Sequence, residues 1–100
     1  MNYANAIKSI MEHNKISQSG LSKSTGIGQA TLSRILTGKT IPSTETICKI
    51  AEAFGQPKLV MDFFALEDKD VPVTKKKLYK ILHPQLNELF RTLLVYDQQP

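Results

Sequence analysis

The stretch of sequence that decides the fold is residues 17–36, which read SQSGLSKSTGIGQATLSRIL. Ser17 is a good N-cap for a short helix, and Gly26 can take the left-handed conformation that ends it. A second short helix is predicted over 29–36, and the chain is expected to leave it at Gly38. Two short helices joined by a turn that contains glycine are typical of a helix-turn-helix.

Apolar and polar residues divide this stretch into an inner and an outer side. Four apolar side chains occupy the positions that hold two such helices together, namely Leu21, Ile27, Leu32 and Ile35. Ser22 is small enough to let the two helices approach closely. The outward face of 29–36 is then left with short or hydrogen-bonding side chains, which fit a major groove of DNA: Gln29, Ala30, Ser33 and Arg34.

The flanking sequence predicts three further helices, each with one buried stripe. The first is expected from about Asn2 to His13. Another has Ser43 as its N-cap and ends at Gly55, and the next begins at Pro57. The residues expected in the core are Tyr3, Ala6, Ile7, Ile10 and Met11, then Ile47, Ile50, Ala51 and Phe54, and finally Leu59, Val60, Phe63 and Phe64.

The remaining chain is expected to be a linker and a further helical segment. Residues 1–66 would form the helix-turn-helix domain, 67–73 the linker, and 74–100 the C-terminal segment. Because proline cannot donate the backbone hydrogen bond of a helix interior, Pro84 predicts a break or kink at His83 and the start of a new helix. A strong apolar stripe follows, made of Leu86, Leu89, Phe90, Leu93 and Leu94.

Length and charge narrow the class of protein. A chain of 100 residues with 41% hydrophobic and 22% charged residues suits a compact globular fold. Its net charge is +4, and the stretch from His13 to Thr44 contains no Asp or Glu but has four cations, Lys15, Lys23, Arg34 and Lys39. Such a stretch favours binding to a polyanion, although charge alone leaves an ordinary solvated face as the alternative.

Other classes of function find little support. The single Cys48 cannot form an internal disulfide and is expected to be a small packing residue, and His13 and His83 are too far apart in sequence for a zinc site. No paired carboxylates, nucleophile with a base or phosphate-binding glycine loop can be assembled, so neither an enzyme nor a cofactor is expected. With no apolar run long enough for a bilayer, the chain is expected in the cytoplasm.

The residues resemble those of the phage-repressor type of helix-turn-helix protein, the group of Cro and lambda repressor. The matching positions run in order from Ser17 to Ala51: Ser17, Gln18, Leu21, Ser22, Gly26 and Ile27, then Leu32, Ser33, Arg34 and Ile35, then Gly38, Lys39, Pro42, Ser43, Thr46, Ile47, Ile50 and Ala51. The resemblance extends over about residues 5–64. It implies an all-α fold, a five-helix lambda-repressor-like DNA-binding domain with an added C-terminal helical segment.

The resemblance also implies roles on double-stranded DNA. Gln29 and Arg34 would read bases, because glutamine can pair with adenine and arginine with guanine, while Ala30 and Ser33 would lie at the same base edges. A second group would contact backbone phosphates: Ser17, Gln18, Lys23, Thr31, Lys39 and Thr40.

One departure from the family pattern concerns two positions together. Relatives often carry an arginine where this chain has Met11 and a glutamate where it has Leu36, and those two residues form an ion pair. Replacing both members with apolar residues strands no charge, so the double change is compatible with the fold.

The leading hypothesis is a homodimeric transcriptional repressor that binds a palindromic operator. Its dimer interface would be the C-terminal stripe of Leu86, Leu89, Phe90, Leu93 and Leu94, although the same helix could instead pack on the core near Phe63 and Phe64. Two alternatives are an antitoxin-type protein whose C-terminal segment binds a partner protein, and a helix-turn-helix module that binds only protein.

Overall fold

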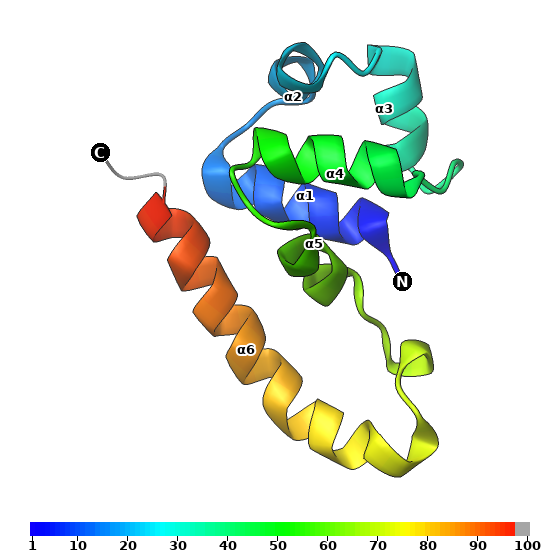
Figure 1. The fold of residues 1–100 in the computed structure, drawn as a ribbon, viewed down its shortest axis with the longest axis vertical. Coiled ribbons are helices and arrows are strands. Elements are labelled where there is room, and N and C mark those ends of the chain that lie inside the picture. The colour runs from blue at the N-terminus through cyan, green and yellow to red at the C-terminus, as the bar shows by residue number, and fades with distance from the viewer. Residues whose placement is uncertain (98–100) are drawn as a thin grey trace.

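The computed structural model describes residues 1–97, with backbone only for Phe90 and residues 93–97 (Figure 1). Six α-helices follow one another: α1 (Tyr3–Asn14), α2 (Gln18–Thr25), α3 (Gln29–Leu36), α4 (Thr44–Ala53), α5 (Lys58–Ala65) and α6 (Lys76–Asp97). Two 3-10 turns, η1 (Asp68–Asp70) and η2 (Val73–Lys75), lie between α5 and α6. Over these residues the fold is all-α, a five-helix domain of the predicted type with an added C-terminal helix.

The helices begin and end where their capping residues predict. Ser17 accepts a hydrogen bond from the Gly20 backbone N–H at 3.0 Å, and Ser43 accepts one from the Thr46 N–H at 3.2 Å, so α2 and α4 each begin at a satisfied N-cap. Gly26 ends α2 with φ of 77°, a conformation that a side chain would strain. The helix α3 spans Gln29–Leu36, the predicted range, and Gly38 follows with φ of 79°.

The core lies where α1, α3, α4 and α5 meet. Its buried members include residues from each of the first five helices: Ile7, Ile10, Leu21, Leu32, Ile35, Leu36, Ile47, Ile50, Ala51, Phe54 and Met61. One core prediction was wrong, because Leu59 is 72% exposed. The helix α5 turns Met61 and Ala65 inward instead, and both are fully buried. Cys48 is exposed as well, so it is not the packing residue that was expected.

A polar contact ties the start of α1 to α5. The Tyr3 hydroxyl donates to Asp62 Oδ1 at 2.6 Å, and Lys58 Nζ donates to Asp62 Oδ2 at 2.7 Å. Partial burial and then the bond to Asp62 raise the pKa of Tyr3 to about 12. Burial acts to raise the pKa of Asp62, but the hydrogen bonds from Lys58 and Tyr3 together bring it below its usual value.

The segment that leads to α6 is more ordered than an extended linker. It folds into η1 and η2, and the amino group of Met1 lies 2.7 Å from Asp70 Oδ2 and 3.3 Å from Glu67 Oε1. The hydrogen bond to Asp70 is the main cause that raises the pKa of the Met1 amino group, and the same bond lowers the pKa of Asp70. This contact ties the first residue of the chain to the linker segment between α5 and α6.

The predicted break at His83 was wrong, because α6 is one continuous helix from Lys76 to Asp97 with Pro84 inside it. Proline removes one backbone hydrogen bond, but the turns on both sides keep theirs. The neighbouring His83 is fixed by aromatic contacts: its ring stacks on Phe63 at 4.8 Å between centroids and lies 4.7 Å from Tyr79. The contact with Phe63 holds the helix against α5 just before the proline, and Arg91 bonds to His13 of α1 beyond it.

The side of α6 that faces the domain carries polar contacts, while much of its apolar side is exposed. Arg91 Nη1 donates to His13 Nε2 of α1 at 2.6 Å, and the Tyr79 hydroxyl donates to the Leu66 carbonyl at 3.4 Å. Leu86 and Leu89 of the predicted stripe are 39% and 53% exposed. The side chains of Phe90, Leu93 and Leu94 lie outside the described residues. No helix in the part of the chain described here is long and apolar enough to cross a membrane.

Candidate DNA interface

Buried apolar side chains hold α2 and α3 together and attach both to the core. Leu21 of α2 is 1% exposed, Leu32 of α3 is fully buried, and Ile35 is 2% exposed. Each helix therefore has one side inside the domain and one side free. Because both are only eight residues long, their orientation depends on these few contacts and on the turn that joins them.

The turn between α2 and α3 is fixed by two hydroxyl groups. The Ser22 hydroxyl donates to the Ile27 carbonyl at 2.6 Å, and Thr25 Oγ1 accepts from the Ile27 N–H at 3.2 Å. Thr25 also donates to the Leu21 carbonyl at 2.8 Å. Ser22 thus does more than leave room for the neighbouring helix, because it satisfies a backbone carbonyl at the corner. That role was not evident from the sequence.

The outward face of α3 is exposed in the free protein. Gln29, Ala30, Thr31 and Arg34 are exposed, and Ser33 is half-buried. These side chains stand opposite the face that carries Leu32 and Ile35. The structure therefore brings the four predicted base-reading residues, Gln29, Ala30, Ser33 and Arg34, onto one accessible helix surface.

Gln18 connects the starts of the two helices. Its Nε2 donates to the Gln29 carbonyl at 3.3 Å, and its side chain is half-buried. The backbone N–H groups of the first turn of α2 lie beside it, and Ser17 satisfies only one of them, that of Gly20. The N-terminus of α2 and the N-terminus of α3 therefore lie next to each other, with an amide side chain between them.

Arg34 is held by the loop that follows α3. Its Nε donates to Thr40 Oγ1 at 3.2 Å, and its carbonyl accepts the N–H groups of Lys39 and Thr40 at 2.9 and 3.2 Å. The loop therefore folds back over the C-terminal end of α3. Since Nε is engaged by Thr40, the terminal amino groups of the guanidinium remain for an external acceptor, and Lys39 is exposed beside them.

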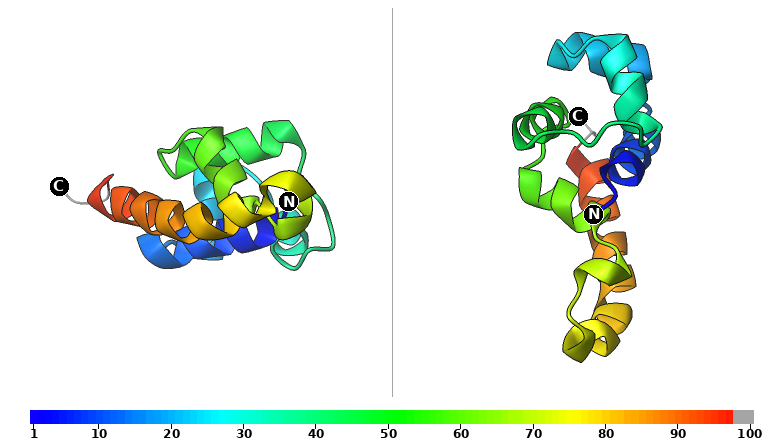
Figure 2. Two further views of the ribbon diagram at one scale, coloured as in Figure 1. Left: turned by 90° about the horizontal axis from the view of Figure 1, so that it is seen from below. Right: turned by 90° about the vertical axis from the view of Figure 1, so that its right-hand side faces the viewer.

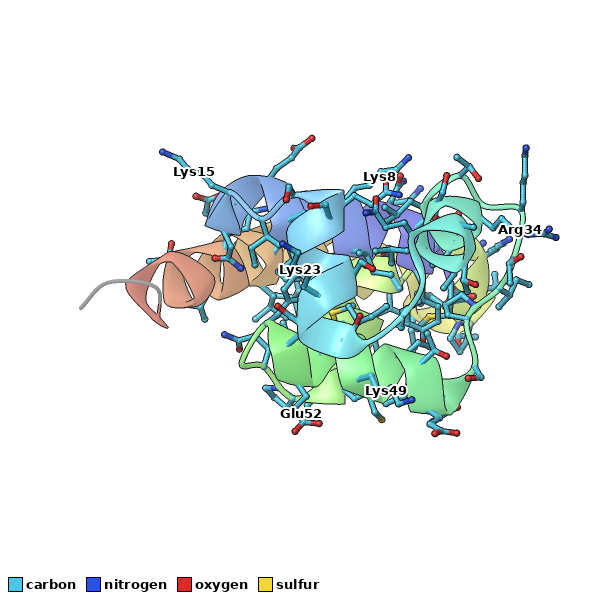
Figure 3. All side chains as sticks on the ribbon, turned by 90° about the horizontal axis from the view of Figure 1, so that it is seen from above. Lys8, Lys15, Lys23, Arg34, Lys49 and Glu52 are labelled. Atoms are coloured by element: carbon cyan, nitrogen blue, oxygen red, sulfur yellow. The ribbon has the colours of Figure 1, made fainter. Side chains whose placement is uncertain are left out.

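Basic side chains gather on the side of the molecule formed by α2 and α3. Figure 3 shows Lys23 on α2, Arg34 at the end of α3, and Lys8 and Lys15 on α1 in the same view. The predicted set of contacts did not include the two lysines of α1. Lys8, Glu12 and Lys15 border the same open groove as Ser17. Lys15 is the C-cap of α1, with φ of 54°, and lies just before α2 begins. Lys15 could have been suspected from its place in the acid-free stretch.

The unusual pair Met11 and Leu36 lies at the junction of α1 and α3. Both line that groove, and Leu36 is 7% exposed while Met11 packs partly buried against the core. Two apolar side chains therefore occupy the junction where the family resemblance leads one to expect an ion pair. The junction therefore contains no charge that needs a partner.

Two short helices anchored by buried side chains, an exposed polar face on the second helix and basic side chains near that face define a helix-turn-helix DNA-binding domain. A family model described as helix-turn-helix matches residues 7–58, just over half of the chain. The chain belongs to this helix-turn-helix family, of the Cro and phage-repressor type, and is a DNA-binding protein of that kind. The comparisons found no curated protein and no solved structure that matches it.

Proposed function

We propose that the protein is a homodimeric transcriptional repressor that inserts α3 into the major groove of a palindromic operator and acts in the cytoplasm on nucleoid DNA. The observation that carries this proposal is the exposed face of α3, where an amide (Gln29) and a guanidinium (Arg34) point outward from a helix anchored by Leu32 and Ile35. Repression would follow from occupation of a promoter.

In this proposal Arg34 and Gln29 read the sequence. The terminal amino groups of Arg34 reach O6 and N7 of a guanine, and the Gln29 amide pairs with N6 and N7 of an adenine. Ala30 and Ser33 contact base edges between them. The short side chains at these two positions, together with the exposure of Gln29 and Arg34, support a close approach of α3 to the groove.

The remaining predicted residues grip the DNA backbone. Gln18 and Ser17 would meet a phosphate at the N-terminus of α2, where the positive end of the helix dipole favours an anion. The other phosphate contacts proposed are Lys23, Thr31, Lys39 and Thr40. The absence of Asp and Glu from 14–43 supports this assignment, because no like charge would repel a phosphate along this stretch.

The experiment that tests the proposal is selection of bound fragments from random double-stranded DNA. We expect a motif with two-fold symmetry, with half-sites about 34 Å apart, one helical turn, or a multiple of that distance. An unsymmetrical motif would contradict the dimer, and failure to enrich any motif would contradict sequence-specific binding altogether.

Arg34→Ala then separates reading from gripping. We expect a loss of about 1 to 3 kcal/mol in binding to the selected motif and relaxed preference at one position per half-site. Lys49→Ala is the matched control, since it removes an exposed positive charge from α4, outside the residues proposed to contact DNA (Figure 3). Equal losses of Arg34→Ala on the motif and on random DNA would refute base reading.

A further inference from the structure

The helix α6 carries a second apolar surface that its own domain leaves uncovered. Five large side chains are between 39% and 57% exposed, and they define what we term the α6 apolar face: Leu78, Ile81, Leu82, Leu86 and Leu89. Five exposed large apolar side chains along one helix face, interrupted only by Gln85, are uncommon on a protein that acts alone. A hollow of about 250 Å³, bordered by this face and by Phe63 of α5, adjoins it.

The face lies away from the surface proposed to meet DNA. Figures 1 and 2 show α6 on the side of the core opposite α2 and α3, with its N-terminal half extending beyond the domain. Its contacts within the domain are with α1 and α5. A molecule bound to the α6 apolar face would therefore leave Gln29 and Arg34 accessible.

Two oppositely charged residues beside the face are separated by the same number of residues as two of its leucines. Lys77 and Glu88 are eleven residues apart, as are Leu78 and Leu89. Eleven residues complete about three helical turns, so each pair lies on one line along the helix. Lys77 and Glu88 thus border the same edge of the face at opposite ends, and neither forms an ion pair among the residues that the structure describes.

From this spacing we infer that the α6 apolar face pairs with the same face of a second copy of the chain, with the two α6 helices antiparallel. When one helix is reversed, Leu78 lies opposite the partner's Leu89, and Lys77 comes beside the partner's Glu88. The two-fold axis repeats both contacts, which gives two opposite-charge pairs at one edge. In a parallel pair this edge would meet the other edge of the partner, and the charges would find no counterpart.

The inference rests on the dimer of the proposed function and specifies how that dimer is built. The axis would pass close to His83 and Pro84, midway between Leu78 and Leu89. Leu82 would then lie near the centre of the interface. It faces the partner's Gln85 and Leu86, where burial contributes most to affinity.

Cysteine cross-linking tests the direction of the two helices. In a Cys48→Ser background, Leu78→Cys and Leu89→Cys are prepared separately and then mixed under mild oxidation. We expect a disulfide-linked dimer that contains one chain of each variant, and little cross-linking of either variant alone. Efficient cross-linking of each variant with itself would establish a parallel pair and overturn the inference.

Exchange of the bordering charges tests the predicted register. Lys77→Glu and Glu88→Lys should each raise the dimer dissociation constant about threefold to tenfold, and the double variant should recover the wild-type value. Sedimentation at low ionic strength measures these constants. Failure of the double variant to recover would refute the pairing of Lys77 with Glu88, since a purely local role on α6 predicts no such rescue.

A last variant separates this inference from the DNA-binding proposal. Leu82→Glu should raise the dissociation constant at least about a hundredfold, because both copies lose the contact, while the helical circular dichroism is retained. Leu59→Glu, on the exposed side of α5, is the control and should remain dimeric. A wild-type protein that sediments as a monomer while still selecting a DNA motif would overturn the inference and leave base reading intact. A wild-type dimer that selects no motif would do the reverse.

Discussion

The bond between Arg34 and Thr40 leads to a prediction about how the guanidinium is aimed. Arg34 Nε donates to Thr40 Oγ1 at 3.2 Å, so Thr40 restricts a long side chain that would otherwise sample many rotamers. Thr40→Val removes this acceptor and keeps the shape. If Thr40 acts by orienting Arg34, the substitution should weaken binding to the selected motif only while Arg34 is present.

The magnitude follows from the geometry of the contact. An intramolecular hydrogen bond contributes about 0.5 to 1.5 kcal/mol, and this one involves an exposed Arg34 and a half-buried Thr40 at a moderate distance. We therefore expect the lower half of the range, about 0.5 to 1 kcal/mol. This corresponds to a twofold to fivefold rise in the dissociation constant.

The assay is a double-mutant cycle measured by fluorescence anisotropy on the selected motif, with wild type, Thr40→Val, Arg34→Ala and the double variant. Thr44→Val is the control, because it makes the same change on an exposed residue at the start of α4. A loss of equal size in the Arg34→Ala background would refute the orienting role. Thr40 would then act on a phosphate by itself, the role that the family resemblance implies.

Three other measurements test the phosphate contact of Lys39 and the contributions of Tyr3 and Leu32 to stability. Lys39→Ala should weaken binding to all DNA sequences alike and reduce the slope of affinity against salt by about one, and a loss confined to the selected motif would contradict its assignment to phosphate. Tyr3→Phe should lower the free energy of unfolding by about 1 kcal/mol, because it removes the hydrogen bond to Asp62. The pKa of Tyr3 is raised from 10.0 to about 12, so the stability that Tyr3 confers is complete below pH 10 and is lost as the pH rises toward 12. Alkaline denaturation curves of equal steepness for wild type and Tyr3→Phe would show that this tyrosine is not the group responsible. Leu32→Ala should lower the free energy of unfolding, measured by chemical denaturation, by about 2 to 5 kcal/mol, because Leu32 is fully buried where α3 meets the core. A loss below about 1 kcal/mol would show that the structure collapses around the smaller residue.

Much of the fold was predictable because local signals and burial agree in the first five helices. Ser17 and Ser43 cap helices as expected, and the stripe of α4 is buried throughout. The stripe of α5 was harder to assign. Its apolar residues run almost around the helix, so periodicity alone could not tell Leu59, which is exposed, from Met61, which is buried.

The errors at the C-terminal end have a different cause. Pro84 is a local signal for a helix end, but the contacts of His83 with Phe63 and of Arg91 with His13 join residues far apart in sequence, and they hold α6 to the domain on both sides of the proline. Similarly, Ser22 could be recognised as small, but its bond to the Ile27 carbonyl depends on the exact path of the turn. The residues of the candidate site were predictable by type, whereas the partners that position them were not.

The separation of anchoring and outward residues on α3 bears on how such a protein can acquire a new target. Leu32, Ile35 and Leu36 secure the helix from within, so exchange of the exposed Gln29, Ala30 or Arg34 would change the free energy of unfolding by no more than about 1 kcal/mol. Under the proposed function, a library of variants at these positions should consist largely of folded proteins. New operator preferences are therefore within reach of one or two substitutions, without a stabilising mutation elsewhere.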